Sequence, residues 1–310
     1  MTFNDKGYFV QNIDLIEGFK AIEDNSIDCI VTDPAYEVIS GGAQENEDVQ
    51  RPGGMLSAND GKIFEHNNIK ISQWIGECYR VLKDNTHIYV MTNFLNLEEY
   101  MSEIRKAGFD LHNLLIWEKN NATPNRWYMK NCEYIIFARK GAAKPINDCG
   151  TKTVIPVRNV VNKVHPTEKP VELMEIFINN STNPGDIVLD PFGGSMSTIL
   201  AAIKNGRKGI GFEIDKKYFD IGLERLENFD PSTVVLTEKV HRLTPHQLLI
   251  LDVLKSNPDR DFSGAELSEI TGLSSRTCSG CITPLCSAQK AIKTNDRSPF
   301  RIKYKEVVNE

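Results

Sequence analysis

The chain has 310 residues, of which 40% are hydrophobic, enough for the packed core of one large domain and a smaller one. No apolar run approaches the roughly 18 residues of a membrane span, and no signal-peptide pattern is present, so we expect a cytoplasmic protein with no membrane partner. The seven cysteines fit reduced thiols, and the net charge of −6 argues against a uniformly basic, nucleic-acid-binding coat.

The first elements lead into a motif that ends a strand. Apolar residues at helical spacing predict a short helix from Leu15 to Ile22, followed by a turn at 24–26 and the strand Cys29–Thr32. The tetrapeptide Asp33-Pro34-Ala35-Tyr36 follows that strand directly. Residues 37–68 are rich in Gly, Asn and Glu and lack periodicity, so we expect a long mobile loop with a functional role.

The rest of the large domain alternates between helical and strand patterns. Helices are expected over about 69–83, 96–107, 170–180, 196–205 and 216–228, and strands over about 87–91, 114–117, 134–137, 187–190 and 209–214. This alternation predicts a doubly wound α/β sheet. A polar loop, 120–127, lies between two of the strands. It places Arg126 and Trp127 where they could contact DNA backbone or bases, and surface packing is an equal alternative.

A second motif, Asp190-Pro191-Phe192-Gly193-Gly194-Ser195, follows the apolar run 187–189. Both motifs should therefore lie at the carboxyl ends of parallel strands, where open α/β sheets bind ligands. The glycine pair permits a tight turn close to a ligand, and Ser195 is placed to cap the next helix. Glu213, at the end of the following strand, is suited to accept hydrogen bonds from ribose hydroxyls.

The C-terminal residues predict a separate unit after a linker at 231–240. Thr244-Pro245 begins one helix, Ser263 caps a second that ends at Gly272, and a third opens at 274–276. With a turn and strand near 294–304, these helices indicate a winged helix-turn-helix over 241–310. Its basic residues Arg276, Lys290 and Arg297 are candidate DNA contacts. Three cysteines (Cys278, Cys281 and Cys286) have no obvious fourth ligand, so we predict no metal site.

Four segments together resemble a known family. These are His165-Pro166-Thr167-Glu168-Lys169-Pro170, Asn183-Pro184-Gly185-Asp186, Asp190 to Ser195, and Gly211-Phe212-Glu213-Ile214-Asp215. They are similar to the amino-methyltransferases of DNA over about residues 8–228. The order of motifs, with the tetrapeptide before the glycine turn, resembles the β class of these S-adenosylmethionine-dependent enzymes. The resemblance implies a Rossmann-like methyltransferase sheet with permuted motif order over residues 1–230, S-adenosylmethionine as cofactor and double-stranded DNA as partner.

The resemblance also implies roles for individual residues. In the family, residues at the positions of Asp33 and of Asp190, Pro191, Phe192, Gly193, Gly194 and Ser195 lie around the cofactor. Glu213 would hold the ribose, His165 and Lys169 match a further cofactor motif, and Asp14 aligns with an acid near the adenine.

The tetrapeptide carries the catalytic prediction. Asp33 can accept one N–H of an exocyclic amine and the Pro34 carbonyl the other, while Tyr36 offers a flat face to a base swung out of the duplex. Ala35 departs from the family's usual second proline, but the acceptor carbonyl belongs to Pro34. A leading Asp favours adenine N6 over cytosine N4.

Three alternatives remain open at this point: cytosine-N4 transfer, methylation of RNA or a protein amide, and a DNA-binding regulator with an inactive methyltransferase domain. Homodimer formation is also left open.

Overall fold

The chain divides into two units, Met1–Leu236 and Thr237–Glu310. The computed structural model describes residues 2–35, 69–123, 127–161, 168–234, 244–287, 291–294 and 301–304. The expected mobile loop at 37–68 lies outside these residues. None of the helices in the described ranges is long and apolar enough to cross a membrane.

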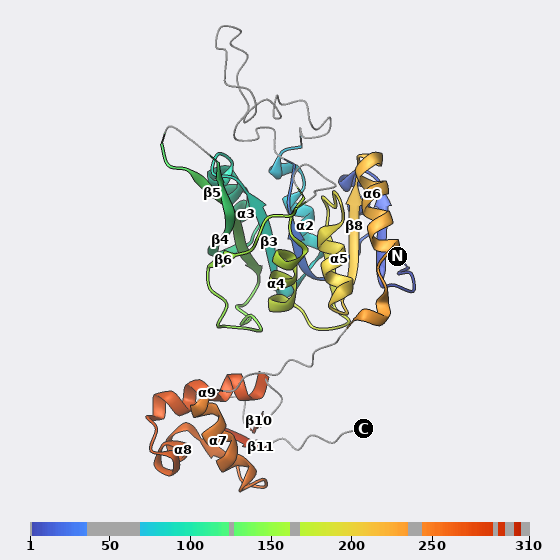
Figure 1. Cartoon of the computed structure of the whole chain (residues 1–310). Coiled ribbons are helices and arrows are strands. Elements are labelled where there is room, and N and C mark those ends of the chain that lie inside the picture. The colour runs from blue at the N-terminus through green and yellow to red at the C-terminus, as the bar shows by residue number, and fades with distance from the viewer. Residues whose placement is uncertain are drawn as a thin grey trace. The chain divides into compact units, whose positions relative to one another are not determined.

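Within the described residues, the first unit is built on an eight-stranded sheet with the order β1-β8-β7-β2-β3-β5-β4-β6 (Figure 1). Its strands are β1 (Tyr8–Asn12), β2 (Ile27–Thr32), β3 (Leu82–Thr92), β4 (Asp110–Thr123), β5 (Lys130–Lys140), β6 (Val154–Pro156), β7 (Ile187–Asp190) and β8 (Lys208–Glu213). The neighbouring strands β1, β8, β7, β2 and β3 are parallel to one another. β5 runs antiparallel to both β3 and β4, and β6 is parallel to β4.

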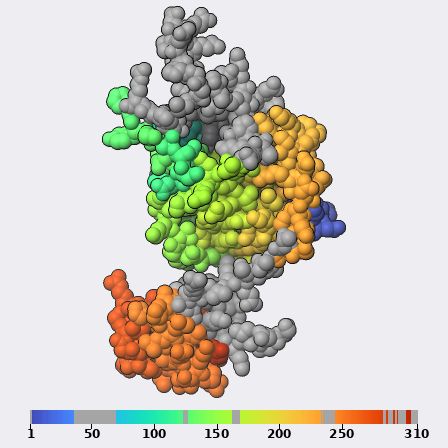
Figure 2. Space-filling view, in the orientation of Figure 1, coloured from blue at the N-terminus to red at the C-terminus, as the bar shows by residue number. Residues whose placement is uncertain are grey.

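Helices cover both faces of this sheet (Figure 1). They are α1 (Leu15–Lys20), α2 (Ile75–Val81), α3 (Leu97–Lys106), α4 (Val171–Ser181), α5 (Ser197–Lys204) and α6 (Lys216–Glu227). Alternate residues of β3 point to opposite faces of the sheet and belong to two hydrophobic cores. Ile88 and Val90 pack with α1, α2 and α3, whereas Tyr89 and Met91 pack with α4 and α5. In the space-filling view, α4 occupies the middle of one face and α6 flanks it (Figure 2).

The sheet confirms the expected α/β alternation and corrects several details. The helix expected over 69–83 is a 3₁₀ turn, η1 (Ile71–Gln73), followed by the short α2. The strands expected at 114–117 and 134–137 form a longer hairpin, so residues 120–123 continue β4 and the loop is shorter than predicted. β1 and β6 were not predicted. β6 has only three residues and contains Pro156, so it has little strand signal.

The second unit contains three helices and a small sheet within its described residues. The helices are α7 (Pro245–Lys255), α8 (Gly264–Thr271) and α9 (Ser275–Ser287). β9 (Phe262–Ser263), β10 (Ala291–Lys293) and β11 (Arg301–Tyr304) pair antiparallel in the order β10-β11-β9. The predicted caps are confirmed. Thr244 and Ser263 each form a capping box, and Gly272 ends α8 with φ of +73°.

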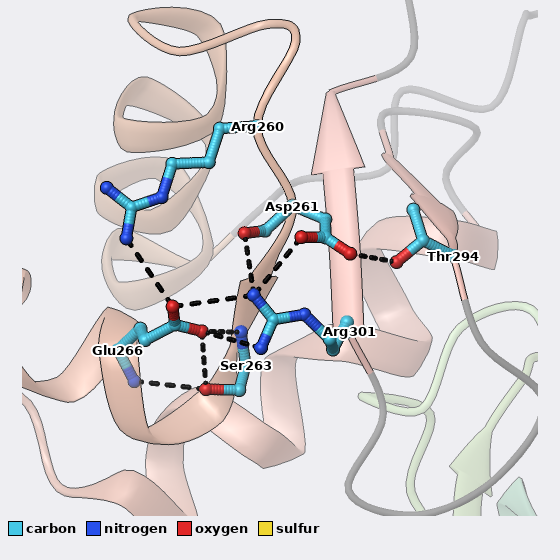
Figure 3. A network of polar contacts seen from close by, with 6 residues as sticks. All are labelled: Arg260, Asp261, Ser263, Glu266, Thr294 and Arg301. Atoms are coloured by element: carbon cyan, nitrogen blue, oxygen red, sulfur yellow. Dashed lines mark hydrogen bonds and ion pairs between the residues drawn. The ribbon is translucent and has the colours of Figure 1, made fainter.

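A network of charged side chains joins β11 to the start of α8 (Figure 3). The Arg301 guanidinium lies 3.1 Å from Asp261 and 3.0 Å from Glu266, and Thr294 donates to Asp261 at 2.7 Å. Hydrogen bonds from the backbone and hydroxyl of Ser263 lower the pKa of Glu266 to about 2. Arg301, one of the basic residues near the C-terminus, is therefore paired with acids of its own unit.

Candidate active site

The site lies between β2 and β7, two adjacent strands from which the chain continues to opposite sides of the sheet. β2 and β7 are adjacent and parallel, with Cys29 opposite Val188 and Ile30 opposite Leu189. From β2 the chain continues to β3 on one side, and from β7 to β8 on the other. Asp33 directly follows β2 and Asp190 ends β7, so the two motifs meet at neighbouring carboxyl ends, as predicted.

A cavity of about 870 Å³ opens at this point. It is lined by most of the predicted site residues: Asp14, Asp33, Pro34, Ala35, Trp127, Lys169, Asp190, Pro191, Phe192, Gly193, Gly194, Ser195 and Glu213. Tyr36, Arg126, His165, Lys290 and Arg297 lie outside the described residues. Arg276 is exposed in the first turn of α9, in the second unit.

Asp190 organises the turn between β7 and α5. Its Oδ1 accepts hydrogen bonds from the Thr32 hydroxyl at 2.8 Å and from the Phe192 amide at 3.0 Å. Burial raises the pKa of Asp190 to about 7, although these hydrogen bonds oppose the rise. Its carboxylate thus holds the turn in place and ties β7 to β2. Thr32 was not among the predicted residues.

The glycine turn is packed as closely as its sequence suggests. Gly194 has φ of +51°, and the Gly193 amide donates to the Phe212 carbonyl at 2.7 Å. A Cβ on Gly193 would lie 2.8 Å from the Met196 side chain and 3.0 Å from that carbonyl. Only glycine therefore fits at position 193 without displacing its neighbours.

The prediction that Ser195 caps the next helix is wrong. The residue before α5 is Met196, in the left-handed conformation with φ of +60° and without a side-chain cap. The Ser195 hydroxyl and carbonyl instead accept hydrogen bonds from Arg225 of α6, at 2.9 and 2.6 Å. Arg225 also pairs with buried Glu168 at 3.0 Å. It therefore links the glycine turn to the segment that holds Lys169, a role that no local pattern in the sequence predicts.

Glu213 stands at the end of β8 with both carboxylate oxygens oriented by backbone. Oε2 accepts from the Gly194 amide at 2.7 Å and Oε1 from the Asp215 amide at 2.8 Å. Burial raises the pKa of Glu213 above its ordinary value, against the effect of these hydrogen bonds. A carboxylate has about four acceptor sites, so Glu213 keeps acceptor capacity for a hydroxyl group in the cavity.

Asp14 has a structural role as well as a place in the cavity wall. It is the N-cap of α1, and its Oδ1 accepts from the Ile16 amide at 2.8 Å. Asp14 and Leu15 both line the cavity, so an acidic group lies next to an apolar side chain there.

Asp33 belongs to a chain of charges. Its carboxylate pairs with the Lys169 ammonium, which also lies 3.5 Å from Glu133 of β5. Glu133 pairs in turn with Lys119 of β4. Burial alone would lower the pKa of Lys169, but Asp33 and Glu133 outweigh it and raise that pKa, so Lys169 is a cation. Glu133 and Lys119 were not predicted.

The residues around this cavity fit S-adenosylmethionine. The volume lies within the roughly 300–1,000 Å³ of small-molecule sites. Glu213 presents oriented carboxylate oxygens that suit hydroxyl donors such as those of a ribose. Ile13, Leu15 and Ile214 line the cavity with apolar residues, and the glycine turn brings backbone to it without a side chain in the way.

Comparisons with known proteins agree with this site. The model of a DNA methylase family, N6_N4_Mtase, matches residues 27–155 and 151–224. The Type II methyltransferase M2.DpnII of Streptococcus pneumoniae is 29% identical over 73% of this chain and 91% of that protein. The putative methylase YubD of Escherichia coli (strain K12) is 31% identical over 70% of this chain and 89% of that protein.

A solved structure shows the same relationship. The crystal structure of the M1.HpyAVI-SAM complex superposes with a TM-score of 0.54 at 26% identity, covering 70% of this chain and 99% of that one. The chain therefore belongs to the DNA methylase family that modifies exocyclic amines, and it is a DNA methyltransferase that uses S-adenosylmethionine.

Proposed function

We propose that this enzyme transfers the methyl group to the N6 amine of adenine at specific sites in double-stranded DNA. The observation that supports this most directly is the placement of Asp33 and Pro34 on the wall of the cavity that also contains the Asp190 turn and Glu213. The acid that begins the tetrapeptide favours adenine over cytosine, in line with the family resemblance.

The chemistry requires a better nucleophile than a free exocyclic amine, because the nitrogen lone pair is delocalised into the aromatic ring. When bound, S-adenosylmethionine supplies an electrophilic methyl group on its sulfonium. Asp33 accepts one amine N–H and the Pro34 carbonyl accepts the other, which draws the nitrogen toward tetrahedral geometry. Holding the amine in line with the methyl supplies much of the rate enhancement. Ala35 leaves this pair of acceptors intact.

The target adenine must leave the duplex to reach this cavity. The described part of the rim carries large exposed apolar side chains: Phe94, Leu95, Trp127, Tyr128 and Met129. Phe94 and Leu95 follow β3, and the other three precede β5. Aromatic side chains at the mouth of a base-accepting cavity are suited to stack on bases, at roughly 1–3 kcal/mol for each stacked base. We propose that Tyr36 and Arg126 also contribute to DNA binding.

The second unit is proposed to extend the DNA contact as a winged helix-turn-helix over 241–310, joined to the catalytic domain (1–230) by the linker 231–240. Its three helices and antiparallel strands suit that role, and Arg276 is exposed on α9. If α9 contacts phosphates through Arg276, with Lys290 and Arg297 nearby in sequence, Arg276→Ala weakens DNA binding with a shallower salt dependence. Unchanged affinity and salt slope would remove Arg276 from the interface.

The base assignment is tested with isotopically labelled S-adenosylmethionine and unmethylated genomic DNA. After transfer, the DNA is digested to nucleosides, and the labelled nucleosides are identified by mass spectrometry. We expect label in N6-methyladenine. Label in N4-methylcytosine would keep the fold and the mechanism but overturn the choice of base, and cofactor binding without label in DNA would favour a regulator or another substrate.

A further inference from the structure

Four charged side chains of alternating sign line one side of the cavity. In order they are Asp33, Lys169, Glu133 and Lys119. Asp33 directly follows β2 and Lys169 precedes α4, while Glu133 lies near the start of β5 and Lys119 lies on β4. The Lys169 side chain is only 8% exposed, and the other three are between 19% and 24% exposed. The set is electrically neutral, with two carboxylates and two ammonium groups.

Lys169 is shared between two acids. Its ammonium pairs with Asp33 and lies 3.5 Å from Oε2 of Glu133, while the other carboxylate oxygen of Glu133 holds Lys119. Glu133 is fixed by the hairpin, because it lies opposite Trp117 in the β4–β5 register and Lys119 is two residues further along β4. The Lys119 ammonium also lies 4.8 Å from the centroid of the Trp117 ring, which further restricts it.

Sharing of the ammonium matters for the acceptor strength of Asp33. When one carboxylate is the sole counter-ion of a buried cation, much of its negative charge is directed to that cation, and it is a weaker acceptor for a neutral N–H. When a second acid shares the cation, the first carboxylate is a stronger acceptor. Loss of Glu133 would give the set a charge of +1 and remove the second acid that shares Lys169 with Asp33. Loss of Lys119 would give it a charge of −1 and allow Glu133 to draw Lys169 away from Asp33.

We propose that Glu133, held by Lys119, is a positioning residue for methyl transfer, which acts by sharing the Lys169 ammonium with Asp33. This inference rests on the proposed role of Asp33 as the acceptor for the target amine. It gives the loop-proximal part of the β4–β5 hairpin a role in methyl transfer and assigns Lys169 to the orientation of Asp33.

The test is a charge-balance cycle on the full-length enzyme with genomic DNA as substrate. Glu133→Gln keeps the size of the side chain and removes its charge. We expect kcat at saturating cofactor to fall by about 10- to 100-fold. Folding, measured by thermal unfolding, and KM for DNA should change little. Glu118→Gln, an exposed neighbour on β4, is the matched control and should retain normal turnover.

The double variant Glu133→Gln/Lys119→Met restores neutrality. Because Lys119 acts through Glu133, the double variant should turn over no more slowly than Glu133→Gln alone, whereas independent residues would give the product of the two single losses. A kcat for Glu133→Gln equal to that of Glu118→Gln, or multiplicative losses in the double variant, would overturn the inference. Wild-type enzyme that does not methylate DNA would contradict the proposed function instead, so the two failures are distinguishable.

Discussion

The Thr32 hydroxyl donates to Asp190 Oδ1 at 2.8 Å, and this hydrogen bond joins the end of β2, which Asp33 follows, to the end of β7, which the glycine turn follows. The two residues are 158 positions apart in the chain. Both are buried, so water cannot replace the bond. The strand end before Asp33 and the glycine turn are therefore held in a fixed position relative to each other.

Removal of this donor should loosen both halves of the site. Thr32→Val keeps the side-chain shape and should lower the free energy of unfolding by about 1–3 kcal/mol, because it takes a partner from a buried carboxylate. It should also weaken S-adenosylmethionine binding, as measured by calorimetry. Thr86→Val is a matched control, since Thr86 donates to the Lys83 carbonyl away from the cavity. Equal cofactor affinity in the two variants would argue against the coupling.

The raised pKa of Asp190 predicts a pH dependence of stability. Its pKa in the folded state is about 7 and the ordinary pKa of an aspartate is 3.8, so between these values the folded state holds a proton that the unfolded state has released. Its contribution to stability is therefore full at low pH and is lost as pH rises toward about 7. Asp190→Asn should flatten this part of the profile in chemical unfolding between pH 5 and 8. Superimposable profiles for wild type and variant would contradict the assignment.

Arg225 should matter for cofactor affinity more than for chemistry. Arg225→Met removes the link between Ser195 and Glu168 and leaves the buried Glu168 carboxylate without this cation. We expect a weaker affinity for S-adenosylmethionine with a nearly normal rate at saturating cofactor, because the tetrapeptide is not touched. Arg105→Met, at an exposed position of α3, provides the control. A lower rate at saturation with unchanged affinity would place Arg225 in a different role.

Gly222 of α6 tests the packing beneath the glycine turn. A Cβ there would lie 2.5 Å from the Met196 side chain and 3.2 Å from the Gly194 carbonyl. Gly222→Ala should therefore destabilise the protein by about 1–3 kcal/mol and weaken cofactor binding. Gly76→Ala, in α2, meets nothing within 4 Å and should be neutral or stabilising. Thermal unfolding of both variants checks this contrast, and equal effects would show that Met196 moves aside freely.

The location of the site at the carboxyl ends of β2 and β7 could be predicted from the sequence, because each motif is an acid at the end of an apolar run. This signal is local and does not depend on which residues lie nearby in the fold. The roles of Thr32, Glu133, Lys119 and Arg225 were not predicted. Their partners are distant in the chain, and no local sequence pattern distinguishes them from other polar residues. The Ser195 cap was wrong because Arg225 uses its oxygens and Met196 takes the left-handed position. The roles assigned to individual site residues stay predictions.

Asp33 is the residue on which the account depends most, and its substitution separates chemistry from cofactor binding. The decisive measurement is the single-turnover rate of Asp33→Ala on unmethylated DNA, with the dissociation constant for S-adenosylmethionine determined in parallel. We expect transfer to be abolished while cofactor affinity changes little, because Glu213 and the Asp190 turn remain intact. Normal transfer by Asp33→Ala would contradict the proposed mechanism.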